Sequence, residues 1–171
     1  MKGLIDENFR KQPLKYAIQC GIAMVTLVIV LLFLNVLTHT ALIASLGATV
    51  FTVFSRPNSY FSKTRTLLGG YTIGILSGVF MHVVYVNLRG TIYFGDSRFI
   101  FAAAAAAAVG IAILVMVILN MEHAPAAGIA LGLVVNQWDI FNLQFIIISV
   151  LIIALVKRAL RFFLIDLTGE E

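Results

Sequence analysis

Long uncharged stretches dominate this 171-residue chain and restrict its fold more than any other feature. A membrane-spanning α-helix needs roughly 20 apolar residues, and several stretches reach that length. We expect long helices at residues 15–37, 67–88, 99–119 and 140–156. The sequence lacks the period-two alternation of an outer-membrane β-barrel. Because backbone groups that face lipid must be hydrogen-bonded within the protein, helices remain as the way to cross the bilayer. The chain is therefore predicted to be an all-α, polytopic membrane helical bundle.

Composition supports this class and excludes others. Hydrophobic residues make up 61% of the chain and charged residues 12%, too few charges for an ordinary soluble domain. The net charge is +4, but Lys and Arg gather at the two chain ends and in one loop, a topology signal rather than a nucleic-acid-binding surface. The single cysteine, Cys20, permits no internal disulfide. We expect the lipid bilayer as a partner and no nucleic acid.

Motifs of known enzymes are absent from the sequence. It contains no His-Glu-x-x-His zinc motif, no Gly-x-Ser-x-Gly elbow and no phosphate-binding loop. We therefore expect no enzymatic activity, no cofactor and no bound metal.

The chain divides into a short N-terminal segment, one membrane domain and a tail. The N-terminal segment covers residues 1–14 and either lies on the membrane surface or frays, and the tail covers residues 163–171. The membrane domain at residues 15–162 contains two candidate halves, 15–88 and 99–162.

Two further apolar segments, residues 41–54 and 124–135, are short. At 1.5 Å per residue the first reaches only about 21 Å, against a hydrocarbon core of roughly 30 Å. Either both segments cross, giving six spans, or both are broken or re-entrant, giving four. The fold is thus predicted as four long and two short helices.

The basic residues do not decide between these topologies. Six crossings place every Lys and Arg except Arg89 and Arg98 on one side, whereas four crossings exclude Arg56, Lys63 and Arg65 instead. Both topologies put the two termini in the cytoplasm by the positive-inside rule. We expect the plasma (inner) membrane of a prokaryote.

A polar break between the long apolar run 99–119 and the short segment 124–135 is a candidate functional site. Pro125 is tolerated in the first turn of a helix, so a new helix is expected to start there. The free N–H groups and positive dipole of such a start favour an anion. The candidate substrate-binding residues of this break are Asn120, Glu122, His123, Ala124, Pro125 and Gly128.

Glu122 and His123 each have two interpretations. Glu122 could carry a proton during coupled transport, or it could be a solvated carboxylate beside the helix dipole. His123 could supply a proton or a hydrogen-bond donor, because imidazole titrates near pH 6.5, or it could be structural.

The first half has a similar order of a long helix, a polar break and a short helix. Asn35, His39 and Gly47 correspond to Asn120, His123 and Gly132 within one residue of a constant offset. Interrupted segments at matching positions in two halves indicate a transporter with a binding site near the midplane. We therefore predict an internal two-fold repeat, inverted if both short helices cross, in which both short-helix starts face one ion. The candidate residues in the first half are His39, Thr40, Ser45 and Gly47.

Glycines recur every fourth residue in the span 67–88. Gly70, Gly74 and Gly78 share one helix face, where a neighbouring helix can approach closely. That neighbour could belong to the same chain or to a second copy. The second case allows a homo-oligomer, and a non-transporting scaffold or sensor acting through helix packing is the alternative function.

Two stretches carry a family resemblance. One runs from Ala44 to Phe54 and is followed by Pro57, Arg65 and the glycine-rich span; the other runs from His123 to Gly128. In these stretches, and over most of residues 15–156, the chain resembles the HPP family of integral membrane proteins, whose signature is His-Pro-Pro-Ala-Gly. It departs from that signature at Ala124, where the first proline is expected.

The resemblance adds a function to the predicted fold. Members of the family are often described with four membrane spans, and plant and cyanobacterial relatives are linked to nitrite transport. The resemblance therefore implies a transporter or channel for a small inorganic anion such as nitrite.

Overall fold

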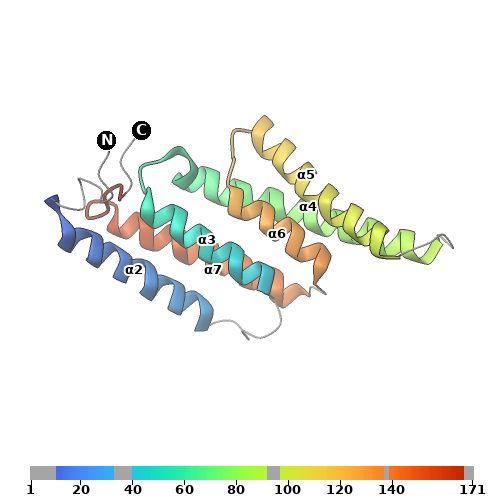
Figure 1. Cartoon of the computed structure of the whole chain (residues 1–171), viewed down its shortest axis with the longest axis horizontal. Helices are drawn as coiled ribbons and strands as arrows, with labels where there is room; N and C mark the ends of the chain where they lie inside the picture. The colour runs from blue at the N-terminus through green and yellow to red at the C-terminus, as the bar shows by residue number, and fades with distance from the viewer. Residues whose placement is uncertain (1–10, 33–39, 92–96, 137–138, 168–171) are drawn as a thin grey trace, which may run out of the picture.

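The computed structural model describes residues 11–32, 40–91, 97–136 and 139–167, and within these ranges it contains helices and no strand (Figure 1). The helices are α2 (Pro13–Leu32), α3 (Thr40–Ser55), the 3₁₀ helix η1 (Tyr60–Ser62), α4 (Thr64–Thr91), α5 (Ser97–Ile118), α6 (Ala124–Val135) and α7 (Ile140–Leu160). α2, α4, α5 and α7 are long and apolar enough to cross a membrane, whereas α3 and α6 are shorter. The predicted fold of four long and two short helices is confirmed.

The bounds differ from the predicted ones mainly in α4. This helix has 28 residues and begins at Thr64, so the polar residues before Leu67 belong to its first turn. Residues 33–39, which include Asn35 and His39, lie outside the described part of the chain.

Local sequence accounts for the ends of two helices. α7 starts where the Asp139 side chain accepts a hydrogen bond from the Asn142 backbone N–H at 2.8 Å, an N-cap. Lys157 and Arg158 lie in its last turn, where positive charge complements the helix dipole. α5 ends at Ile118, and Asn120, in the turn that follows, takes the left-handed backbone conformation with φ 52°.

The helices lie in two layers. α2, α3, α6 and α5 lie side by side in that order, because α3 contacts both α2 and α6, and α6 also contacts α5. Behind them, α7 packs on α2 and α3, and α4 packs on α6 and α5, with α7 and α4 in contact (Figure 1). The core therefore lies between the pair of short helices and the two helices behind them.

Successive helices run in alternating directions along the bundle (Figure 1). One end of the bundle, called the loop end here, holds the α3–α4 connection, the α5–α6 connection and residues 161–167. Hydrogen bonds join these three segments to one another: the Asn58 side chain donates to Asp166 at 3.0 Å, and the Tyr60 hydroxyl donates to Glu122 at 2.6 Å. α3 therefore ends and α6 begins at the loop end, where α4 also begins and where α5 and α7 end.

Residues near the C-terminus close over the α3–α4 connection and α2. The Gln19 amide donates to the carbonyl oxygens of Phe54 at 2.5 Å and Ile165 at 2.7 Å, and accepts from the Ile165 N–H at 3.0 Å. The Leu167 N–H donates to the Ser55 carbonyl at 2.8 Å. We call this set of contacts the C-terminal clasp. It satisfies a buried amide in α2 with backbone from the far end of the chain.

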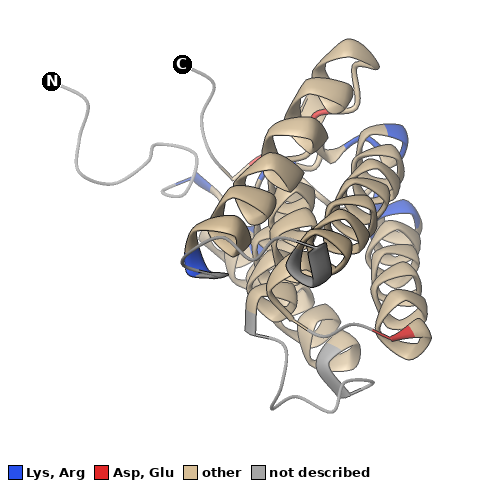
Figure 2. Cartoon of the chain, turned by 90° about the vertical axis from the view of Figure 1, so that its right-hand side faces the viewer, with Lys and Arg blue, Asp and Glu red and all other residues tan. Residues whose placement is uncertain are grey.

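In the described part of the chain, charged residues lie near helix ends and in connections, and the middle of each long helix carries none (Figure 2). Phe80, Phe99, Leu155 and other large apolar side chains are exposed on those sides. An apolar flank with charged ends is the distribution expected of helices that contact lipid.

Candidate functional site

Backbone hydrogen bonds determine the conformation of the α5–α6 connection. The Met121 N–H donates to the Met116 carbonyl at 2.9 Å and the Asn120 N–H to the Val117 carbonyl at 3.2 Å. Together with the positive φ of Asn120, these bonds form a Schellman motif, which ends a helix by pairing its last carbonyl groups. Asn120 was predicted to bind substrate; its exposed side chain does not line the cavity described below, and its position is that of a helix terminator.

α6 starts directly after this turn. His123 is its N-cap residue, with extended backbone at φ −135° and ψ 96°, and Pro125 lies in the first turn as expected. The His123 side chain makes no capping hydrogen bond. Its imidazole instead turns inward, into the space between α3 and α4.

The imidazole of His123 is almost completely buried, with 1% of its residue surface exposed. Its Nδ1 lies 3.0 Å from the Phe61 carbonyl oxygen and its Nε2 lies 3.1 Å from Thr49 Oγ1. Thr49 Oγ1 lies in turn 2.6 Å from the Tyr71 hydroxyl and 3.0 Å from the Ser45 carbonyl. Since a carbonyl oxygen only accepts, Nδ1 carries a proton.

Burial decides the electrostatics of this histidine. Removal from water lowers the pKa of His123 to about 4, although the hydrogen bond to the Phe61 carbonyl acts in the opposite direction. The imidazole is therefore neutral at pH 7, with Nδ1 as donor and Nε2 as acceptor.

The neighbouring Glu122 lies in a different environment. Its carboxylate is only partly buried and accepts a hydrogen bond from the Tyr60 hydroxyl at 2.6 Å. This bond lowers the pKa of Glu122 below its ordinary value of 4.5, and it raises the pKa of Tyr60. Glu122 is thus a carboxylate at neutral pH.

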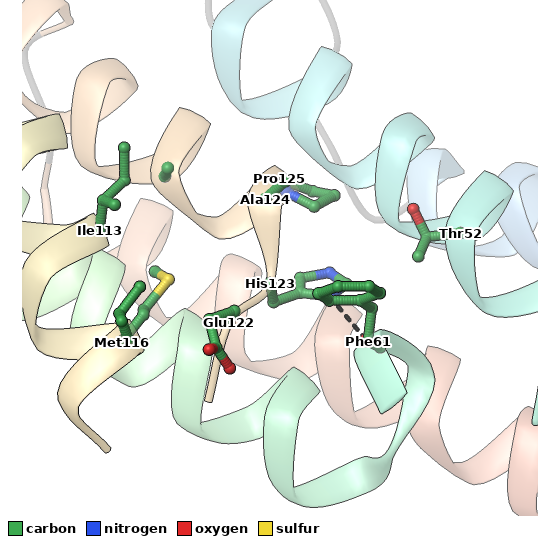
Figure 3. Close-up of a pocket in the computed structure, with 10 residues that line it drawn as sticks. Thr52, Phe61, Ile113, Met116, Glu122, His123, Ala124 and Pro125 are labelled. Carbon is green, nitrogen blue, oxygen red and sulfur yellow. Dashed lines mark hydrogen bonds between the residues drawn. The ribbon is translucent and has the colours of Figure 1, made fainter. Parts of the chain in front are cut away.

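A cavity of about 430 Å³ opens at the start of α6 (Figure 3). Its lining comes from α3, the α3–α4 connection, α5, the α5–α6 connection and α6, and consists of Thr52, Phe61, Ile113, Met116, Val117, Glu122, His123, Ala124, Pro125 and Ala127. The walls are mainly apolar, and the polar groups are those of Thr52, Glu122 and His123. A few polar groups in an apolar cavity are typical of a small-molecule site.

The glycine row of α4 lies against α6. A Cβ at Gly70 would be 2.8 Å from His123 Cβ, a Cβ at Gly74 would collide with the Ala126 carbonyl oxygen, and a Cβ at Gly78 would be 2.8 Å from the Ala130 carbonyl oxygen. The close approach expected of this row therefore occurs within one chain. α6 of the same chain thus occupies the face that a homodimer or scaffold contact was also expected to use.

The two short helices cross as an antiparallel pair. Ser45 of α3 lies against Gly128 of α6, at a point where a glycine Cβ would collide with the serine hydroxyl. Toward the start of α3, a Cβ at Gly132 would meet Leu42 at 2.7 Å, and toward its end Thr49 bonds His123. The starts of α3 and α6 therefore lie at opposite ends of the pair. The prediction that both starts hold one ion is wrong for this geometric reason.

The structure gathers only some of the predicted binding residues at the cavity. Glu122, His123, Ala124 and Pro125 line it, and Ser45 with Gly128 forms the helix crossing instead. Gly47 faces open space, with nothing within 4 Å of an added Cβ. Thr40 is the first residue of α3, at the opposite end of the pair from His123. His39 lies outside the described residues.

Four residues near His123 had not been predicted: Thr49, Tyr60, Phe61 and Tyr71. A partial signal existed, because Ser45, Thr49 and Thr52 recur at helical spacing within an apolar segment. Tyr71 directly follows Gly70 in the sequence, but which residues its hydroxyl contacts depends on which helices pack on that side of α4.

The family comparison covers nearly the whole chain. A family model described as HPP, transmembrane region, matches residues 9–166. No curated protein and no solved structure matches the chain.

Proposed function

Because this chain belongs to the HPP family of integral membrane proteins, we propose that it is a transporter or channel for a small inorganic anion, of which nitrite is the leading example. The observation that carries the proposal is the cavity at the start of α6, where His123, Thr52 and the uncapped helix start converge. The alternative of a scaffold acting through the glycine row has no free surface to act through.

The start of α6 supplies the attraction for an anion. Backbone N–H groups in the first turn of a helix have no partner within the helix, and the dipole places partial positive charge there. Pro125 contributes no N–H and the Ala126 N–H donates to the His123 carbonyl, so Ala124, which also lines the cavity, supplies the candidate donor. The apolar walls strengthen any such interaction by excluding water.

Glu122 tunes this site rather than holding the ion. Its carboxylate would repel an anion, and the hydrogen bond from Tyr60 directs it toward the loop end. This repulsion favours an anion that enters together with a positive charge, because the pair carries no net charge. A small anion needs little room, since a water molecule occupies about 30 Å³, so the cavity has space for partly hydrated ions.

The helix neighbours support an inverted repeat of two three-helix halves. If α2 is exchanged with α5, α3 with α6 and α4 with α7, every helix pair in contact becomes another pair in contact. The central α3–α6 pair is antiparallel, as inverted halves require. We propose that all six helices cross and that access alternates between the two halves.

This topology agrees with the basic residues. The loop end carries Arg56, Lys63 and Arg65 together with Lys157 and Arg158 near the end of α7. By the positive-inside rule we place the loop end and both termini in the cytoplasm, with the protein in the plasma membrane of a prokaryote.

Flux into proteoliposomes tests the proposal. The purified protein should admit nitrite, followed separately with nitrate, formate and chloride, under imposed pH gradients and voltages. The His123→Ala variant should lose most of this flux, whereas Gly110→Ala, a substitution into open space on α5, should retain it. Absence of flux for all four anions under every gradient would remove the anion-transport reading.

A further inference from the structure

We infer that His123 takes up one proton together with the anion, with the Thr49 hydroxyl reversing its hydrogen bond to accommodate that proton. The inference rests on the proposed function and adds a coupling ion to it. Transport would then be a symport of one proton with one anion, and Thr49 would be a positioning residue for the protonated imidazole.

The hydrogen bonds around neutral His123 have one consistent direction. Nδ1–H donates to the Phe61 carbonyl at 3.0 Å, so Nε2 can only accept, and its partner is Thr49 Oγ1 at 3.1 Å. The single proton of Thr49 therefore points to Nε2. The Tyr71 hydroxyl, 2.6 Å away, then donates to Thr49 Oγ1.

The same atoms satisfy the protonated histidine equally well. When a proton from water forms an N–H bond at Nε2, this group becomes the donor to Thr49 Oγ1. The Thr49 proton then turns to the Ser45 carbonyl, which lies 3.0 Å from Oγ1. Tyr71 continues to donate to the same oxygen. Rotation of one hydroxyl thus keeps every buried polar group paired in both states, and unpaired buried groups are what usually make such a change costly.

Few charges face the imidazole from the elements packed around it. α3 contributes Thr49, α4 contributes Tyr71, and the α3–α4 connection contributes the Phe61 carbonyl. The charged groups nearby are Glu122 on its own segment, Lys63 over the Tyr60 ring, Arg65 near the Leu119 carbonyl, and Lys157 of α7, whose ammonium donates to the Ser62 carbonyl next to Phe61. The Glu122 carboxylate is hydrogen-bonded by Tyr60, and among the described residues the partners of the His123 ring are the Phe61 carbonyl and Thr49 Oγ1.

Burial among uncharged partners therefore keeps His123 neutral, and a bound anion would change that balance. Burial opposes the positive charge, and a negative ion in the adjoining cavity would stabilise it. Linkage makes the effect reciprocal: an anion that promotes protonation is itself bound more tightly by the protonated site. Glu122 is the poorer proton carrier, because the hydrogen bond from Tyr60 favours its ionised form.

Histidine NMR tests the proton site directly. The chain has three histidines, so His39→Gln with His82→Gln leaves His123 as the only one to carry a ¹⁵N label. In lipid nanodiscs we expect the Nδ1-protonated tautomer at high pH, and a midpoint that rises when nitrite is added. An Nε2-protonated tautomer, or a midpoint that nitrite leaves unchanged, would overturn the inference.

Measuring proton uptake together with nitrite flux separates this inference from the proposed transport function. A nitrite gradient should acidify the lumen of proteoliposomes that contain a trapped pH dye, and voltage should have little effect on a neutral proton–anion pair. Thr49→Val should reduce this proton uptake about tenfold and Thr49→Ser about twofold at most, since only serine keeps the hydroxyl. Nitrite flux that is driven by voltage without proton uptake would overturn the coupling and leave the transport function standing. Failure of all anions to move would overturn both.

Discussion

The first turn of α6 has a packed side and an open side. On the packed side, α4 approaches through Gly70 and Gly74, and the His123 imidazole is enclosed with Thr49. On the open side, the same turn borders the cavity, and Glu122 is partly exposed. Adjacent residues thus meet opposite conditions: His123 loses water and becomes neutral, whereas Glu122 keeps its charge.

This difference separates two tasks within a few residues. The packed side fixes where α6 begins, because glycines allow its backbone to lie directly on α4. The open side leaves the helix start accessible to a ligand. Substitutions of the packing glycines should therefore act mainly on stability, those of Glu122 and Tyr60 mainly on flux, and those of His123 and Thr49 on both.

The largest effect is expected from Gly74→Leu on the packed side. A side chain there collides with the Ala126 carbonyl oxygen, and overpacking of this severity costs about 3 kcal/mol or more. Thermal unfolding and size-exclusion chromatography in detergent would measure the loss. Gly110→Leu is the matched control, because a side chain at that glycine meets open space. Equal behaviour of the two variants would contradict the packing described for α4 and α6.

Thr49→Val should have the next largest effect. It keeps the shape of the side chain but leaves His123 Nε2 and the Tyr71 hydroxyl without their shared partner, at a cost of about 2 kcal/mol. Thr49→Ser should cost less than half of that. Unfolding curves of the two variants would separate the hydroxyl from the methyl group, and similar curves would show that packing alone is at stake.

The two neighbours should respond to acid in different pH windows. The pKa of His123 is lowered from 6.5 to about 4 in the folded chain, so the unfolded state binds a proton at higher pH than the folded state does. Stability therefore falls as the pH drops from about 6.5 to 4. Glu122 has a lowered pKa, so its contribution is lost only below 4.5. Melting temperatures from pH 8 to 3 would show both windows. His123→Gln should flatten the upper window and leave the lower one unchanged.

A smaller stability effect is expected on the open side. Glu122→Gln and Tyr60→Phe each weaken one solvent-accessible hydrogen bond, so their melting temperatures should lie closer to that of the parent than the melting temperature of Thr49→Val. Anion flux is the more sensitive readout, because loss of the Glu122 charge removes repulsion at the cavity. A large loss of stability in either variant would place Glu122 on the packed side after all.

The smallest effect is expected from Ala124→Pro, which restores the family signature. Position 124 is the first residue of α6, where proline is favoured, and His123 before it is already extended. The variant should be stabilised by about 0.5 kcal/mol through a less flexible unfolded chain. Differential scanning fluorimetry would measure this shift, and marked destabilisation would indicate that the Ala124 N–H has a needed partner.

Much of the fold followed from the sequence because its strongest signal is local. Apolar runs fixed the long helices, Pro125 marked the start of α6, and the spacing of Gly70, Gly74 and Gly78 required a close neighbour. The identity of that neighbour could not be predicted, because a glycine row accepts any smooth helix. α6 fits it through Ala126 and Ala130.

The site could be predicted only in part. His123 and Glu122 stand out as polar residues in a break, but Thr49 and Tyr71 lie inside apolar helices, where their facing depends on how the helices pair. The shared-ion prediction failed because similar breaks in two halves do not reveal the direction in which each helix runs. Once α3 and α6 are antiparallel, their starts are separated by the length of the pair.

The C-terminal clasp has a consequence for biogenesis. Gln19 lies in α2, which is synthesised before α7, yet its amide is satisfied by the backbone of Ile165, 146 residues later in the sequence. Until then, a polar side chain in an inserted helix must rely on water or on other partners at the membrane surface. The hydrogen bonding of α2 is therefore completed only after residue 165 has been synthesised, and a chain that stops before α7 leaves the Gln19 amide without this backbone partner.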